Sequence, residues 1–207
     1  MKLRTLIFAM LFSTTAHALT EVGPAVEIYS EDQLLRQFAT NAHLKQVKAD
    51  DCQLVQDIQA RALRVDYPAY QFLWGDMLTW GVCVDRDVEQ GLYYIELAAQ
   101  QGLPDALEQL GRYYAHGTLV QKDRERAIPY LREAASLGSV KARILLAQLL
   151  LDDVGSPLDY EDAYRWLYHT VTDDRKTHRQ IAMLRNGLER RMPANIVARA
   201  KKRDTYW

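Results

Sequence analysis

The side chains that could carry out chemistry are few, and their spacing matches no catalytic arrangement. The acidic pairs Asp152-Asp153 and Asp173-Asp174 lack the alternating oxygen ligands of a calcium loop. No serine has the nucleophile-elbow context of a hydrolase, and no glycine loop for phosphate is found. The histidines are isolated from one another, and we expect each to cap a helix or to lie at the surface. Beyond residues 1–18 they are His43, His116, His169 and His178. The sequence therefore predicts no catalytic, cofactor-binding or metal-binding residue, and a protein that is not an enzyme.

Residues 1–18 have the composition of a cleaved secretory signal. A basic start, residues 1–4, is followed by the apolar stretch 5–13 and by the small-x-small sequence Ala-His-Ala at residues 16–18. A membrane anchor is the alternative, but the apolar stretch is too short to cross ~30 Å of hydrocarbon. Cleavage would leave a mature chain that starts at Leu19 and lies outside the cytoplasm.

That compartment changes the interpretation of the two cysteines, Cys52 and Cys83. In an oxidising compartment a cysteine pair is more often a disulfide than a metal site, and no nearby histidine cluster supports a metal. The formal net charge is −1, so bulk attraction to nucleic acid or to anionic lipid is not indicated.

A repeat of 36 residues runs through the middle of the chain and conserves residue classes rather than residues. The stretch YYIELAAQQGLPDA, residues 93–106, returns as PYLREAASLGSVKA, residues 129–142. Such a period with helical patterns is typical of helical hairpins that stack on one another. The series that recur are Gly75/Gly111/Ala147, Gly81/Gly117, Asp87/Asp123/Asp159, Gly91/Ala127/Ala163, Tyr94/Tyr130/Trp166, Ala98/Ala134, Ala99/Ala135 and Gly102/Gly138.

Each class has a physical role in a stack of hairpins. Small residues inside helices let two helices approach closely, although glycine there costs ~1 kcal/mol. Glycines after a helix predict C-terminal caps, and aspartates before one predict N-terminal caps. The predicted packing residues are Gly75, Ala98, Ala99, Gly111, Ala134 and Ala135, with Tyr94, Tyr130 and Trp166 filling space between hairpins. The predicted caps are Gly81, Asp87, Gly102, Gly117, Asp123, Gly138 and Asp159.

The expected helices follow from these caps. First helices of hairpins are predicted near residues 67–80, 104–116 and 140–151, and second helices near 51–65, 87–101, 123–137 and 159–170. Further helices are predicted near 174–191 and from Pro193 to about Lys202. Before the repeats, residues 25–29 alternate like a short strand, and Ser30 starts a capping box.

The segments at the two ends have their own character. Residues 19–50 form either a docking element or a simple cap on the stack. Residues 172–207 contain ten Lys or Arg and four Asp or Glu, which predicts a basic helical cap with a wet outer face. Contact of this cap with an acidic partner or an envelope surface is the alternative.

The stretch from Leu110 to Ala142 resembles a Sel-one-like repeat, a relative of the tetratricopeptide repeat. The resemblance covers residues 51–171 and implies an all-α, helical-hairpin solenoid of about three repeats, with a leading half-repeat and a C-terminal capping region. The third repeat departs from the pattern at Ala147 and Asp153, where glycines are usual. In this arrangement Cys52 and Cys83 fall on one edge of adjacent units, so we expect them to be bonded to each other.

The whole chain also resembles the periplasmic components of the sodium-driven polar flagellar motor. The matching segments are the signal peptide, residues 47–58 (VKADDCQLVQDI), residues 80–102 and the terminal DTYW, residues 204–207. The resemblance implies a non-enzymatic scaffold at the basal body. This scaffold would form a ring with MotY and would help to hold the stator proteins PomA and PomB. The alternatives are another exported Sel-one-like adaptor for an unrelated envelope or signalling complex and, less favoured, a cell-wall hydrolase.

Overall fold

In the computed structural model, residues 28–64 and 66–202 are described, and their regular structure is entirely helical. The expected signal peptide, most of the expected strand at residues 25–29 and the terminal DTYW lie outside this part. The two strand residues that are described, Ile28 and Tyr29, are in no regular element. None of the described helices is long and apolar enough to span a bilayer.

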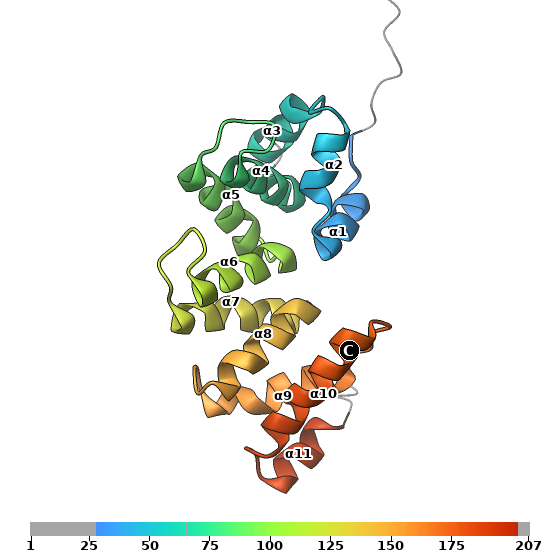
Figure 1. Cartoon of the computed structure of the whole chain (residues 1–207), viewed down its shortest axis with the longest axis vertical. Helices are drawn as coiled ribbons and strands as arrows, with labels where there is room; N and C mark the ends of the chain where they lie inside the picture. The colour runs from blue at the N-terminus through green and yellow to red at the C-terminus, as the bar shows by residue number, and fades with distance from the viewer. Residues whose placement is uncertain (1–27, 65, 203–207) are drawn as a thin grey trace, which may run out of the picture.

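The repeats form three helical hairpins, and the predicted all-α solenoid is confirmed. Each hairpin joins a first helix to a second one by a short loop, and consecutive hairpins stack into a curved array (Figure 1). The first helices are α4 (Pro68–Trp80), α6 (Pro104–His116) and α8 (Val140–Leu151). The second helices are α5 (Val88–Gln100), α7 (Arg124–Ser136) and α9 (Tyr160–His169), the last preceded by a short 3-10 helix, η1 (Pro157–Asp159).

Local sequence rules account for the helix ends. The Asp87 side chain accepts a hydrogen bond from the Gln90 amide at 2.9 Å, and Asp123 does the same for Arg126, so α5 and α7 begin there. Gly81 has a left-handed φ of 63°, and the following residue, Val82, donates from its amide to the Met77 carbonyl at 2.9 Å. This is the Schellman arrangement that ends a helix.

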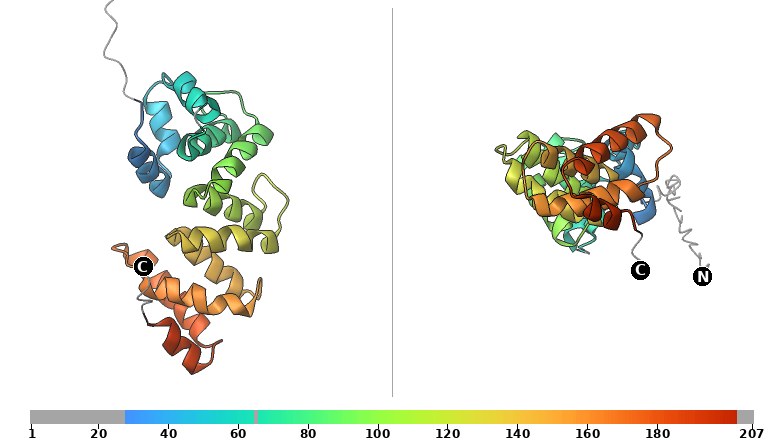
Figure 2. Two further views of the ribbon diagram at one scale, coloured as in Figure 1. Left: turned by 180° about the vertical axis from the view of Figure 1, so that it is seen from behind. Right: turned by 90° about the horizontal axis from the view of Figure 1, so that it is seen from below.

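Helices outside the repeats close both ends of the stack. At the N-terminal end are α1 (Glu31–Thr40), α2 (His43–Ala49) and α3 (Val55–Arg64), of which α3 is the second helix of the expected half-repeat. At the C-terminal end are α10 (Arg175–Glu189) and α11 (Ala194–Ala200). Both helical pairs, α1–α2 and α10–α11, flank the stack, and α1 and α10 lie on the same side of it in two opposite views (Figures 1 and 2).

Candidate interaction surface

The small residues of the repeat lie where helices cross. Ala98 and Ala134 are fully buried, and Ala99 and Ala135 are buried beside them. At Gly75 an added Cβ would come within 2.7 Å of the Gly91 carbonyl oxygen, so α4 and α5 touch backbone to backbone. An added Cβ at Gly111 would instead meet the Leu131 side chain at 2.6 Å. A residue with a side chain at Gly75 would force the two helices of this hairpin apart.

The large aromatic residues of the repeat sit at the margin of the core. Tyr94, Tyr130 and Trp166 are half-buried against it. The Tyr130 ring stacks on Tyr114, with ring centroids 5.7 Å apart, and Tyr114 belongs to the first helix of the same hairpin. This ring stack lies within one hairpin, and the predicted filling of the space between hairpins stays a prediction.

The predicted caps fall at helix ends, with one exception. Gly102, Gly117 and Gly138 all have positive φ and follow α5, α6 and α7. Asp159 does not cap α9 with its side chain, because η1 runs directly into that helix. Its carboxylate pairs with Arg132 at 2.6 Å instead. The prediction of a cap at Asp159 was wrong because the third repeat enters its second helix through a 3-10 turn.

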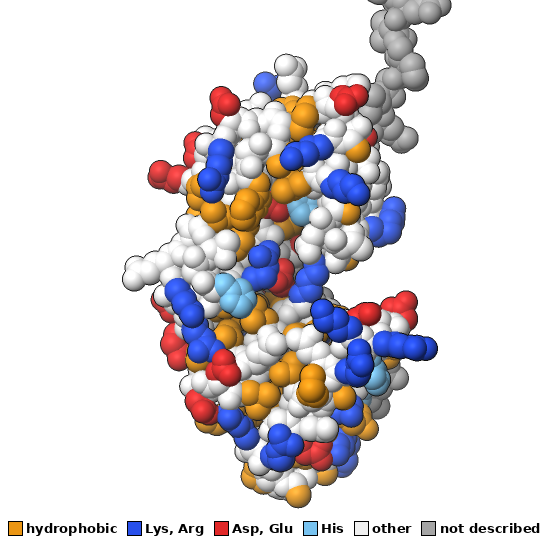
Figure 3. Space-filling view, viewed as in Figure 1, with side chains coloured by type: hydrophobic (Ala, Val, Ile, Leu, Met, Phe, Trp, Pro, Cys, Tyr) orange, Lys and Arg blue, Asp and Glu red, His pale blue; other side chains and the backbone are white. Residues whose placement is uncertain are grey.

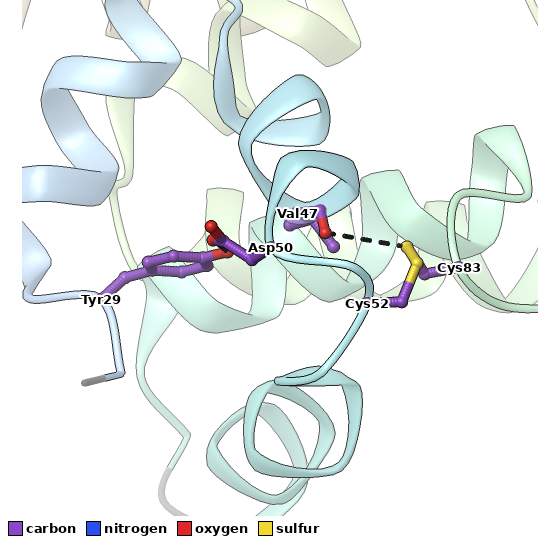
Figure 4. The surroundings of a disulfide bond; sticks show 5 residues. All are labelled: Tyr29, Val47, Asp50, Cys52 and Cys83. Carbon is purple, nitrogen blue, oxygen red and sulfur yellow. Dashed lines mark hydrogen bonds between the residues drawn. A yellow bond between two sulfur atoms is a disulfide. The ribbon is translucent and has the colours of Figure 1, made fainter. Parts of the chain in front are cut away.

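A disulfide joins the N-terminal helices to the first repeat. Cys52 and Cys83 are bonded to each other, with Cα atoms 5.5 Å apart (Figure 4). Cys52 lies in the turn before α3 and not in the helix, and Cys83 lies in the loop between α4 and α5. The Cys83 sulfur also lies 3.9 Å from the Val47 carbonyl oxygen. The bond therefore anchors the end of α2 to the edge of the first hairpin.

The helices α1 and α2 pack against α4 along the inner side of the curved stack. The Phe38 ring of α1 meets the Phe72 ring of α4 edge-on, with centroids 4.7 Å apart, and meets His43 at 5.1 Å. Phe38 is 1% exposed and Phe72 is 2% exposed. Burying aromatic rings of this size strongly favours a fixed position for α1. The helices α1 and α2 are therefore part of the solenoid body.

Beneath these rings lies a buried polar cluster that links three helices. His43 Nε2 of α2 donates to the Asp76 carboxylate of α4 at 2.7 Å. Gln109 of α6 donates to the same carboxylate and to the Tyr113 hydroxyl. Burial raises the pKa of Tyr113, which keeps this hydroxyl neutral. Because His43, Asp76 and Gln109 are nearly inaccessible to water, each depends on the others for its hydrogen bonds.

A lysine of the third repeat reaches the N-terminal helices. Lys141 Nζ, at the start of α8, donates to the Phe38 carbonyl at 3.2 Å and to Asn41 Oδ1 at 3.1 Å. Nearby on α6, burial raises the pKa of Asp105 and of Glu108 despite the lowering effect of the Lys141 charge. The end of α1 thus contacts both the first and the third repeat.

These contacts were not expected from the sequence, although one signal was present. In the 36-residue register Gln109 stands where Leu73 and Leu145 stand, and Asp76 stands where Arg112 and Gln148 stand. A polar residue at an apolar position of a repeat indicates a partner from outside the repeat. Asp76 of the first repeat is that partner for Gln109, and His43 bonds to the same carboxylate.

The remaining histidines lie apart from one another. His116 ends α6, His169 ends α9 with its ring against Tyr168, and His178 lies on the first turn of α10. Within residues 28–64 and 66–202, no three His, Cys, Asp or Glu residues are grouped so as to hold a metal ion. The structure thus provides a rigid curved surface of mixed charge, part of which is hollowed (Figure 3).

Fold and surface define a class, the repeat scaffold. The Sel1 repeat family matches residues 68–103, 104–139 and 140–168, which are the three hairpins described above. The solved Sel1 repeat protein from Oxalobacter formigenes has a TM-score of 0.56, with 22% identity over 62% of this chain and 97% of that one. A protective antigen of uropathogenic Escherichia coli has a TM-score of 0.50, covering 65% of this chain and 28% of that one, at 22% identity. Both likenesses concern the fold.

The chain belongs to the family of the sodium-type polar flagellar protein MotX. It is 64% identical to that protein from Vibrio parahaemolyticus over 211 aligned residues, which cover the full length of both chains. An uncharacterized protein of Neisseria meningitidis serogroup B is 31% identical over 107 residues, or 52% of this chain and 21% of that protein.

Proposed function

We propose that the protein is a periplasmic scaffold of the sodium-driven polar flagellar motor. In this proposal it joins MotY in a ring around the basal body and helps to recruit or hold the PomA/PomB stator. The observation that carries the proposal is the identity of 64% to the Vibrio MotX along the whole chain. At that level the surface features of the relative are expected to be retained as well as the core.

The structure supports a role in holding other proteins. A solenoid presents an extended curved surface, and here disulfide, ring packing and a buried polar cluster fix that surface in one shape. A rigid surface binds partners with a smaller entropic cost than a flexible one. The disulfide also fits an oxidising compartment, in agreement with export.

Within the proposal, the chain is organised in four parts. Residues 1–18 are the cleaved signal, residues 19–50 the N-terminal docking or capping element, residues 51–171 the repeats and residues 172–207 the basic C-terminal cap. The contacts of α1 and α2 with the repeats support a fixed position for these two helices, whose outer face would be available to a ring partner.

A deletion strain of the source bacterium tests the function. Loss of the gene should leave polar filaments assembled but non-rotating, and a plasmid copy should restore swimming. Normal swimming without the gene would contradict the motor role and favour an adaptor for another envelope complex. Cysteine substitutions on the exposed face of α1, crosslinked in intact cells, should yield adducts with MotY; their absence would remove the ring assignment.

A further inference from the structure

A groove with an apolar floor and a basic rim runs between α8 and α10. Its volume is about 490 Å³, and its lining residues are Gln148, Lys176, Arg179, Gln180, Met183 and Leu184. On the face shown in Figure 3, Lys and Arg side chains gather over the region of α10, with hydrophobic side chains next to them. We refer to this feature as the α8–α10 groove.

The groove is bounded at one end by a close helix crossing. At Gly187 of α10, an added Cβ would lie 2.8 Å from Leu151 Cδ1 of α8, so the two helices are in direct contact there. Leu184 and Leu188 are buried along the same seam. The walls are thus set by tightly packed helices and do not depend on a loop.

The floor of the groove exposes apolar surface. The Met183 side chain is 67% exposed, and Leu184 beside it is 9% exposed. A flexible, polarizable methionine next to a fixed leucine suits an apolar side chain of a partner, because methionine adapts to irregular shapes. An exposed methionine in a concave site is therefore a candidate contact rather than a random surface residue.

The rim carries positive charge that the described chain leaves unpaired. Lys176 and Arg179 form no ion pair with residues 28–64 or 66–202, and no carboxylate lines the groove. Asp174, the residue before α10, accepts a hydrogen bond from the Thr177 amide, and this bonding together with the Lys176 charge lowers the pKa of its carboxyl.

Three other cations of the C-terminal region form ion pairs within the described chain. Arg191 pairs with Asp153, Arg199 with Glu161 and Lys201 with Glu189. Lys176 and Arg179, in contrast to these three, place two cations without an ion pair to the described residues beside the apolar floor of the groove.

We propose that the α8–α10 groove binds an acidic amphipathic segment of a partner protein. Apolar side chains of that segment lie on Met183 and Leu184, and its carboxylates face Lys176 and Arg179. This deepens the proposed scaffold function and rests on it. A concave groove between two helices fits a rod-shaped segment in the manner of helix-in-groove recognition.

Site-specific photo-crosslinking tests the proposal. A photoreactive phenylalanine analogue replaces Met183 in the full-length protein, produced in its own bacterium, and the crosslinked peptide is sequenced by mass spectrometry. We expect one partner segment with net negative charge and regularly spaced apolar residues. The pair Lys176→Glu and Arg179→Glu should lower the adduct yield at least tenfold, since opposed charges become like charges.

A matched pair of substitutions outside the groove distinguishes an effect of Lys176 and Arg179 themselves from an effect of net charge. Arg190→Glu with Lys202→Glu makes the same change in net charge at exposed residues outside the groove and should leave the yield within twofold. The groove proposal would be overturned by any of four results: an equal loss of yield for both pairs of substitutions, a crosslinked segment that is neutral or basic, an adduct with lipid, or no adduct. The milder pair Lys176→Gln and Arg179→Gln, with circular dichroism, excludes misfolding as the cause of a loss.

The result can be separated from that for the motor role. If deletion abolishes swimming and the Met183 position gives no acidic adduct, the scaffold role stands and the groove proposal fails. If the deletion strain swims normally, the motor role fails whatever the adduct is.

Discussion

At the scale of single residues, the buried polar atoms decide how the N-terminal helices are held. Asp76 accepts hydrogen bonds from His43 and from Gln109, which come from elements before and after it in the chain. A buried carboxylate is costly unless it is fully hydrogen-bonded, so the three residues act as a unit. That unit specifies where α2 lies on α4, whereas apolar packing alone would tolerate small shifts.

Removing the Asp76 carboxylate should therefore destabilise the fold strongly. We expect Asp76→Ala to lower the free energy of unfolding by about 3 kcal/mol, because two buried donors lose their acceptor. Urea unfolding measures the change, and a double-mutant cycle with His43→Ala should give a coupling energy above about 1 kcal/mol. The exposed Asp85→Ala serves as a control within about 0.5 kcal/mol of wild type. Additive effects of the two mutations would contradict a direct His43–Asp76 link.

The raised pKa of Glu108 predicts that the stability of the fold depends on pH. Burial raises the pKa of Glu108 in the folded protein, so between its ordinary and its raised pKa the folded state holds more protons than the unfolded state. Stability then falls as pH rises through that window.

Glu108→Gln removes this ionisation and keeps an oxygen that can accept from Arg112. We expect the variant to be more stable than wild type at pH 7, and the difference to shrink as pH falls toward about 4.3. Thermal unfolding across this pH range measures the difference, with the exposed Glu133→Gln as the control. A difference that grows on acidification would contradict the assignment.

At the scale of elements, the crossing of the two helices changes from one hairpin to the next. The first hairpin has glycine on both helices, Gly75 and Gly91, whereas the third has Ala147 and Ala163 at the same positions. The third also has Asp153 in the left-handed conformation, φ 61°, where Gly81 and Gly117 stand. Arg191 of the C-terminal region compensates there by donating to the Leu150 and Leu151 carbonyls at the end of α8. The degenerate repeat is thus completed by its cap.

A methyl group at the first crossing should be poorly tolerated. In Gly91→Ala the new Cβ would lie 2.2 Å from Thr79 Oγ1 and 2.7 Å from the Gly75 carbonyl oxygen. The overlap with backbone should cost about 2 kcal/mol or more, which exceeds the gain of ~1 kcal/mol in helix propensity. Gly111→Ala, whose new methyl group meets only the Leu131 side chain within 3 Å, should cost less. Chemical denaturation of both variants compares them, and equal effects would show that backbone contact is not the reason for Gly91.

At the scale of the whole molecule, the N-terminal helices pack back onto the repeats. The α1–α2 pair contacts the first repeat through Phe72 and Asp76 and the third through Lys141, while the disulfide fixes the end of α2. Part of the inner surface on which solenoids bind peptides is thus occupied by the chain's own helices. The α8–α10 groove lies beyond that region, on the C-terminal half.

Loss of the disulfide should loosen this closure. Cys52 and Cys83 are 31 residues apart, and closing a loop of that length stabilises a fold by about 3–4 kcal/mol in the chain-entropy model. We expect reductant, or Cys52→Ser with Cys83→Ser, to lower the urea midpoint accordingly. Hydrogen exchange should rise first in α2 and α3. Reductant should have no further effect on the double variant, and an unchanged midpoint after verified reduction would contradict a structural role.

The sequence by itself determined the solenoid, because its signals act over short distances. Caps such as Asp87 and Gly81 and crossings such as Gly75 with Gly91 work within one 36-residue unit, so their spacing predicts hairpins and their order. Only the tertiary structure decided where α1 and α2 lie. The contact between Lys141 and the Phe38 carbonyl joins residues 103 positions apart, and no local rule specifies such a pair. The same holds for the second wall of the α8–α10 groove, because Gln148 of α8 meets the lining residues of α10 only when the cap packs on the third repeat.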